Sequence, residues 1–381
     1  MSSFADRLRV PDRESEYAGW FQELTGGDRL YSWLREYVAA PDSRVRAQMD
    51  GVEAVLVAWA AGLGDDPRSG SRRVRVRLLQ CLFWCARQAV DCPSAYAGRH
   101  AGAAFTLTAL PECFRGEGDL AWVGVRSFLA AAESEVRVPL ALYNPADGAA
   151  GGRLAELVLE VLPDGCGRVA LHPADWFACR HDAAFRDSVV RTGQAACRGA
   201  EGDWIDGRWR LLHGGQPVST PQGGSGGAVA ARGWAHAVRG RLPDAGVLPI
   251  AAVDAAGRPI PVDTAGVTAK VREALRVLPE LDTLLLCAGE NVAAAEAAVR
   301  AAGRQTRVRV LALEPEPVAE WTAPRSWLVE VLCEYLETVR SSVGALPAYY
   351  PAHLRNGEGF RTIRQRVQVI VEREKWEQWR A

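Results

Sequence analysis

Residues 223–238 read Gly-Gly-Ser-Gly-Gly-Ala-Val-Ala-Ala-Arg-Gly-Trp-Ala-His-Ala-Val, a serine between four glycines followed at once by an apolar stretch. Four apolar residues fall on one face of a helix: Ala230, Trp234, Ala237 and Val238. Gly240 is placed to end that helix. Because glycine tolerates positive φ and close backbone approach, the stretch predicts a tight turn that presents Ser225 at a helix N-terminus.

Strands and helices alternate after this turn. The expected elements are a strand over 247–253, a strand over 258–262, a helix over 267–278, a strand over 281–287, a helix over 293–302 and a strand over 307–313. Asp263 and Thr264 precede the first of these helices and are suited to cap it. Alternation of this kind predicts an α/β or α+β domain.

The flanking sequence predicts three regions. Residues 1–110 have apolar residues at helical spacing and are expected to form a helical domain. From about 113 the pattern changes to short strands, and an α/β domain is expected over 111–320, followed by a helical region over 321–381. The expected elements of its first half are a strand over 136–142, a hairpin from 157–162 and 168–171, a helix over 182–196 and a strand over 208–212.

Composition restricts the class of protein. The chain has 381 residues, 48% of them hydrophobic, and a net charge of -1, which gives no electrostatic basis for binding nucleic acid or an acidic membrane surface. No stretch approaches the roughly 20 apolar residues of a membrane span, and no signal core is seen. Nine cysteines without a disulfide spacing favour a reducing cytoplasm, and the Arg, Ala and Gly content suggests a bacterial source. No metal site or cofactor is expected.

Lysine is rare in this arginine-rich chain. Only Lys270 and Lys375 are lysine, and Lys270 follows Ser225 by 45 residues. A desolvated lysine can lose its proton, whereas an arginine cannot. Lys270 is expected in the first turn of its helix, where the helix dipole and burial both lower its pKa. Thr264 and Thr268 are expected close enough to hydrogen-bond its amine, so Ser225 and Lys270 are candidates for a nucleophile and its base.

The glycines around Ser225 suggest a site for negative charge. A helix N-terminus offers free N–H groups, and Gly224, Gly226 and Gly227 leave room for a bound group. Amides near Ser225 and Gly226 would suit an oxyanion hole. The same geometry would equally suit a phosphate, and Gly-Gly-Ser-Gly-Gly is also a flexible linker by composition.

Taken in order, the residues from 221 to 313 resemble the proteolytic domain of Lon-type Ser–Lys peptidases. The matching features are Ser225, a turn at Gly257, Pro261-Val262, Lys270, the strand Leu284–Leu286 and the pair Glu290-Asn291. The resemblance implies a Lon-like α/β domain between helical regions, with Ser225 as nucleophile and Lys270 as general base. It implies a serine endopeptidase acting on a protein or peptide and regulated by a protein partner, bound through the helical regions, in a bacterial stress or defence pathway. No Walker-type phosphate loop occurs, so ATP-independent cleavage is expected.

Two other functions fit parts of the sequence. One is a catalytically silent Lon-like scaffold that mediates protein–protein interaction, since fold alone does not imply activity. The other is an α/β-hydrolase-type esterase, because Gly223-x-Ser225-x-Gly227 matches a nucleophile elbow. That fold needs a strand directly before the serine, which Pro221 interrupts, and a downstream histidine, for which only His236 and His353 are available.

Overall fold

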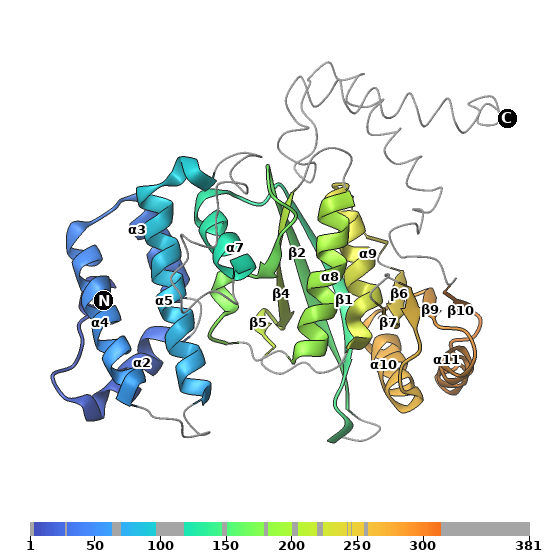
Figure 1. Ribbon diagram of the computed structural model, residues 1–381. Coiled ribbons are helices and arrows are strands. Elements are labelled where there is room, and N and C mark those ends of the chain that lie inside the picture. Colours follow the sequence, from blue (N-terminus) through green and yellow to red (C-terminus); the bar gives the residue numbers. More distant parts are fainter. Residues whose placement is uncertain are drawn as a thin grey trace, which may run out of the picture. The chain divides into compact units, whose positions relative to one another are not determined.

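A computed structural model describes residues 4–26, 29–62, 70–96, 118–146, 151–178, 182–199, 205–218, 224–241, 243–244, 246–254 and 258–313. Helices and strands are mixed in these residues, as the alternating pattern predicted (Figure 1). The predicted helical region over 321–381 lies outside the described residues. Across the described segments, every helix is too short or too polar to traverse a lipid bilayer.

The chain divides into two compact units that are not contiguous in sequence. The first comprises 1–131, 153–158 and 162–224, and the second comprises 132–152, 159–161 and 225–381. The border runs through strand β2 (Gly152–Leu162). These units differ from the sequence-based division into 1–110 and 111–320, because residues 118–131, 153–158 and 162–224 group with the helical part and not with the segment from Ser225 onward.

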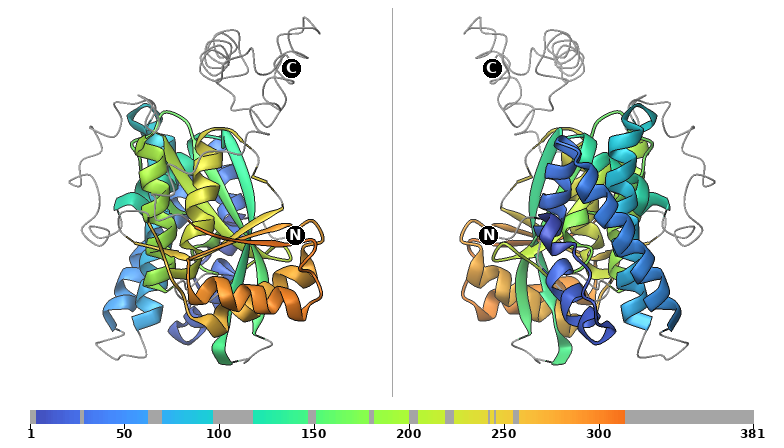
Figure 2. Two further views of the ribbon diagram at one scale, coloured as in Figure 1. Left: turned by 90° about the vertical axis from the view of Figure 1, so that its right-hand side faces the viewer. Right: turned by 90° about the vertical axis from the view of Figure 1, so that its left-hand side faces the viewer.

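The first unit begins with the expected helices. They are α1 (Phe4–Arg7), α2 (Tyr17–Thr25), α3 (Arg29–Ala39), α4 (Ser43–Gly62) and α5 (Gly70–Asp91), drawn in blue to cyan in Figure 2. Helix α2 ends at Thr25, directly before Gly26, and α4 begins at Ser43. Their apolar faces form a core that includes Leu34, Leu56 and Phe83, all fully buried.

A further helix, α7 (Gly118–Leu129), lies where strands were expected. Residues 121–127 are all buried, and residues 120–125 form an apolar run with no polar residue to mark a solvent-facing side. Periodicity cannot distinguish a buried helix from a buried strand in such a run, which explains the wrong prediction. Figure 1 shows α7 beside the sheet strands of the first unit. The helix predicted over 182–196 is confirmed as α8 (Ala183–Gly199).

The largest sheet has the order β1-β2-β4-β3, with β5 paired to β4. Its other strands are β1 (Ser134–Tyr143), β3 (Val169–Leu171), β4 (Asp206–His213) and β5 (Gln216–Pro217). The predicted hairpin of β2 and β3 is wrong, because β4 lies between them and pairs with β3 in parallel. A turn follows β2 nevertheless, with Asp164 at φ 51° and Gly167 at φ 76°.

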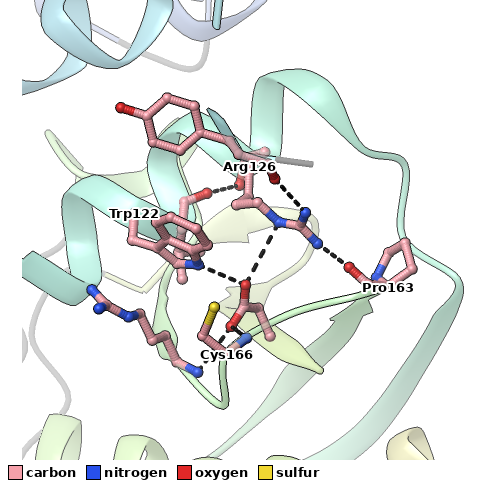
Figure 3. A network of polar contacts seen from close by, with 9 residues as sticks. Trp122, Arg126, Pro163 and Cys166 are labelled. Atoms are coloured by element: carbon pink, nitrogen blue, oxygen red, sulfur yellow. Dashed lines mark hydrogen bonds and ion pairs between the residues drawn. The ribbon is translucent and has the colours of Figure 1, made fainter. Parts of the chain in front are cut away.

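A buried carboxylate connects this turn to β4. Asp206, fully buried, accepts hydrogen bonds from the amides of Cys166 and Arg168 at 2.8 and 3.0 Å and from the Trp122 indole at 2.7 Å. Arg126 lies 3.6 Å away as its ion-pair partner and donates to the Pro163 carbonyl (Figure 3). The turn after β2 is therefore bonded to β4, which accounts for the strand order.

The second unit contains a parallel sheet with the order β10-β9-β6. Its elements alternate as β6 (Val247–Ile250), α10 (Thr264–Val277), β9 (Thr283–Leu286), α11 (Glu290–Ala301) and β10 (Arg309–Ala312). Figure 1 shows α10 and α11 next to each other beside these strands. Parallel strands joined by helices confirm the predicted α/β character of this region.

The remaining strand pair branches from this sheet. The expected strand over 247–253 is interrupted at Ala251, after which β7 (Ala252–Val253) pairs with β8 (Pro259–Ile260) in an antiparallel hairpin. Helix α9 (Gly227–Val238) packs closely within the same unit, since a Cβ on Gly233 would lie 2.5 Å from Leu159 and 3.2 Å from Val138. Gly240, at φ 62°, follows its C-terminus as predicted.

Candidate active site

Ser225 is the middle residue of a 3-10 turn, Gly224–Gly226, that leads directly into α9. The side chain is partly buried. Ala228 at the start of α9 donates its amide to the Ala251 carbonyl at 3.1 Å, which ties the helix to the end of β6. The predicted glycine turn before a helix is therefore present, and its position is fixed by a backbone contact.

Gly227 allows this turn to approach the neighbouring strand. A Cβ at Gly227 would lie 2.7 Å from Cγ2 and 3.0 Å from the backbone nitrogen of Val253. Carbon atoms in real side chains do not come this close, so any larger residue would push α9 away from β7. Gly227, two residues after the serine, is thus required by packing, which the sequence alone does not reveal.

Lys270 projects from α10, which begins earlier than expected. Asp263 is the N-cap and accepts a hydrogen bond from the Gly266 amide at 2.8 Å, so the helix starts at Thr264 and not at 267. Capping by Asp263 is confirmed, but Lys270 lies in the second turn. The helix dipole acts mainly within the first turn, so it is not the principal reason for a lowered pKa here.

The amine of Lys270 contacts the hydroxyl of Ser225. Nζ and Oγ lie 2.5 Å apart, and the lysine has only 4% of its surface exposed. Desolvation by burial lowers the pKa of Lys270 from 10.5 to about 8, while the charge of Asp263 acts in the opposite direction. At pH 7.4 a pKa of 8 leaves about a fifth of the amine neutral, against roughly one part in a thousand for an ordinary lysine.

This arrangement is chemically competent for proton transfer. The protonated amine donates to the Ser225 oxygen, and in the neutral form the serine O–H can donate to the nitrogen lone pair. A hydroxyl that loses its proton to an adjacent base becomes a nucleophile. The structure thus brings together the two residues that the sequence singled out from positions 45 residues apart.

The first amides of the turn are candidate oxyanion donors. A 3-10 turn pairs residue i with i+3, so the N–H groups of Gly224 and Ser225 have no acceptor within the helix. Ala228, by contrast, already donates to Ala251. We therefore expect the oxyanion donor on the Ser225 side of the turn and not at Gly226, where the sequence also placed it.

The two threonines do not support the amine directly. Thr268 donates its hydroxyl to the Thr264 carbonyl at 3.0 Å, within α10. Among the described residues neither threonine side chain is hydrogen-bonded to Lys270, whose side-chain partner there is Ser225. The predicted supporting role is thus not seen as a direct contact.

Asn291 has a structural role that sequence reasoning did not identify. Its side chain accepts from the Val262 amide at 2.9 Å and donates to the Val262 carbonyl at 2.7 Å, and only 2% of the residue is exposed. Val262 immediately precedes the N-cap of α10. A polar residue near the start of a helix is usually solvated, so only the fold could reveal this contact.

The histidines considered for an esterase lie apart from this pair or outside the described residues. His236 follows Ser225 by eleven positions on α9, a separation of about 16 Å along a helix. Burial and the nearby Arg232, Arg241 and Arg239 lower the pKa of His236 to about 4. His353 lies outside the described residues.

No protein-family model matches this chain, and no curated protein sequence matches it significantly. The chemistry of the site is therefore inferred from its own geometry.

Proposed function

We propose that this protein is a Ser–Lys acyl hydrolase, and specifically a Lon-like serine endopeptidase. The observation that carries the proposal is the 2.5 Å contact between the Ser225 hydroxyl and the buried amine of Lys270. Desolvation favours the neutral form of that amine, which a general base requires. The class of hydrolase rests on this geometry, and the Lon-like assignment rests on the order of sequence features.

The proposed acylation step begins with attack of Ser225 Oγ on a peptide carbonyl. The hydroxyl proton moves to Lys270 Nζ, and amides at the start of the turn stabilise the oxyanion of the tetrahedral intermediate. When the intermediate collapses, the C–N bond breaks and the proton passes from Nζ to the leaving amine.

Deacylation would use the same two residues. Water adds to the ester carbon and gives one proton to Lys270 Nζ. The bond between the acyl carbon and Oγ then breaks, and the proton returns to Oγ, which restores the starting state.

The sequence contains no phosphate-binding loop for an unfolding ATPase. We therefore propose that the substrate is a flexible or partner-presented protein segment. Cytoplasmic location and control by a protein partner in a bacterial stress or defence pathway are part of the same proposal.

A serine-reactive probe tests the proposal without knowledge of the substrate. A fluorophosphonate probe is expected to label Ser225 in the wild-type chain, as located by mass spectrometry. The labelling rate should rise about tenfold per pH unit below 8 and level off above it, because only the neutral amine accepts the proton. Lys270→Ala and Lys270→Arg should reduce the rate by about 10²- to 10⁴-fold.

Matched variants make the result specific. Ser225→Ala should abolish labelling, whereas Lys375→Arg changes the other lysine and should label like the wild type. Cleavage of an unstructured protein such as β-casein by the wild type but not by Ser225→Ala would support the endopeptidase. Absence of labelling at pH 9, where the amine is mostly neutral, would favour the silent scaffold.

A further inference from the structure

The chain enters α10 through a segment bonded to α11. Val262, the residue between β8 and the N-cap region, has both of its backbone groups paired with the Asn291 side chain, at 2.9 Å and 2.7 Å. Asn291 is the second residue of α11 and is almost fully buried. A side-chain amide that pairs with the N–H and C=O of one residue fixes the position and the orientation of that peptide.

The N-cap follows this paired residue directly. Asp263 accepts from the Gly266 amide, so the first turn of α10 is fixed one residue after Val262. Beyond the cap the helix is a rigid rod up to the lysine. Lys270 lies six residues after Thr264, about 9 Å along the axis, so a tilt of about 10° at the start moves it by roughly 1.5 Å.

A displacement of that size matters for this contact. Nζ and Oγ are at hydrogen-bond distance, and proton transfer requires that distance to be maintained. A misplacement of about 1 Å from a change remote from the chemistry can cost about 100-fold in rate. The helix therefore needs a fixed starting point, and neither Ser225 nor Lys270 supplies one.

We propose that Asn291 is a positioning residue for the Ser225–Lys270 pair, and that it acts by holding Val262 and thereby the start of α10. The catalytic consequence rests on the proposed function. The structural consequence, a fixed and desolvated Lys270, does not depend on it.

The two lysines of this chain make a direct measurement possible. Lysine labelled with ¹³C at Cε gives two signals by NMR, from Lys270 and Lys375, and Lys375→Arg assigns them. In the wild type the Lys270 signal should titrate near pH 8. In Asn291→Ala the start of α10 is released and water reaches the amine. The pKa of Lys270 should therefore rise by at least one pH unit toward 10.5. Fluorophosphonate labelling of Ser225 should fall at least tenfold.

Val299→Ala is the matched control. Val299 is buried on the same helix, so its truncation lowers stability without touching Val262. The pKa of Lys270 should be unchanged in this variant, and the rate of Ser225 labelling should stay within about twofold of the wild-type rate. Asn291→Leu removes both hydrogen bonds while keeping side-chain volume, and it replaces Asn291→Ala if that variant does not fold.

The outcomes separate the two proposals. If Lys270 still titrates near pH 8 in the Asn291 variants, and Ser225 is labelled in them as fast as in Val299→Ala, the positioning role is overturned. If the wild type is not labelled at Ser225, the proposed function fails. In that case the pKa of Lys270 in the Asn291 variants still tests whether Asn291 keeps the amine buried and desolvated.

Discussion

At the scale of single residues, Lys270 is held where its charge is costly. Only 4% of its surface is exposed, and its ammonium has the Ser225 hydroxyl as its side-chain partner in the described part of the chain. A buried charge with no paired carboxylate lowers stability. Such a residue persists where function requires it, which agrees with the role of general base that we propose.

Lys270→Met should therefore stabilise the protein while removing the base. With a pKa of about 8 when folded and 10.5 when unfolded, the protonated lysine costs about 3 kcal/mol of stability at pH values below 8. The unfolded state binds more protons between pH 8 and 10.5, so wild-type stability rises across that interval. Chemical denaturation should show the variant more stable at pH 7, with the difference shrinking toward pH 10.5. A variant less stable than wild type at pH 7 would contradict this.

At the scale of elements, the contact of α9 with β7 determines where Ser225 lies. Gly227→Ala places a methyl group within 3.0 Å of the Val253 backbone and side chain. Overpacking of this kind costs about 1–3 kcal/mol and displaces the helix start. We expect a lower midpoint in chemical denaturation and at least a tenfold loss of Ser225 labelling.

Gly51→Ala is the control for that variant. Gly51 lies inside α4, and no atom would lie within 4 Å of an added Cβ. Alanine in an open helical position should stabilise by about 0.5–1 kcal/mol. Equal effects of the two substitutions would show that the contact with Val253 is not restrictive.

The elements also show how far sequence patterns reach. The succession from α9 to β10 was predictable, because each strand or helix there has its own periodicity and a capping residue such as Asp263 or Gly240. The pairing of β3 with β4 was not predictable from the sequence, because β4 is distant along the chain and its position beside β3 depends on the buried Asp206. The proximity of Ser225 and Lys270 was inferred from their order, but the Asn291 contact depends on tertiary structure alone.

At the scale of the whole molecule, the second compact unit is assembled from separate parts of the chain. It includes residues 132–152 and 159–161 in addition to the segment from Ser225 onward. Gly233 of α9 packs on Val138 and Leu159, and the neighbouring Trp234 is fully buried. The segment after 225 alone therefore lacks part of its own core.

A fragment of residues 225–381 should not fold by itself, although it contains both Ser225 and Lys270. Without β1 the apolar face of α9 is exposed, so we expect aggregation or loss of the two-state unfolding transition. Ser225 in this fragment should not be labelled by fluorophosphonate, whereas the full chain under the same conditions should be. Wild-type labelling of the isolated fragment would show that β1 is dispensable.

Because Lys270 is buried in α10, cleavage of the chain after this lysine reports local unfolding of that helix. An endoproteinase specific for lysine has two possible cleavage sites in this chain, and the bond after Lys270 lies inside a folded helix. A peptide bond in an intact helix does not fit a protease active site, so cutting there requires local unfolding. When opening and closing are fast, the cleavage rate follows the population of the open form. The appearance of a fragment ending at residue 270 would therefore report, on a single gel, how often the helix that carries the proposed base comes apart.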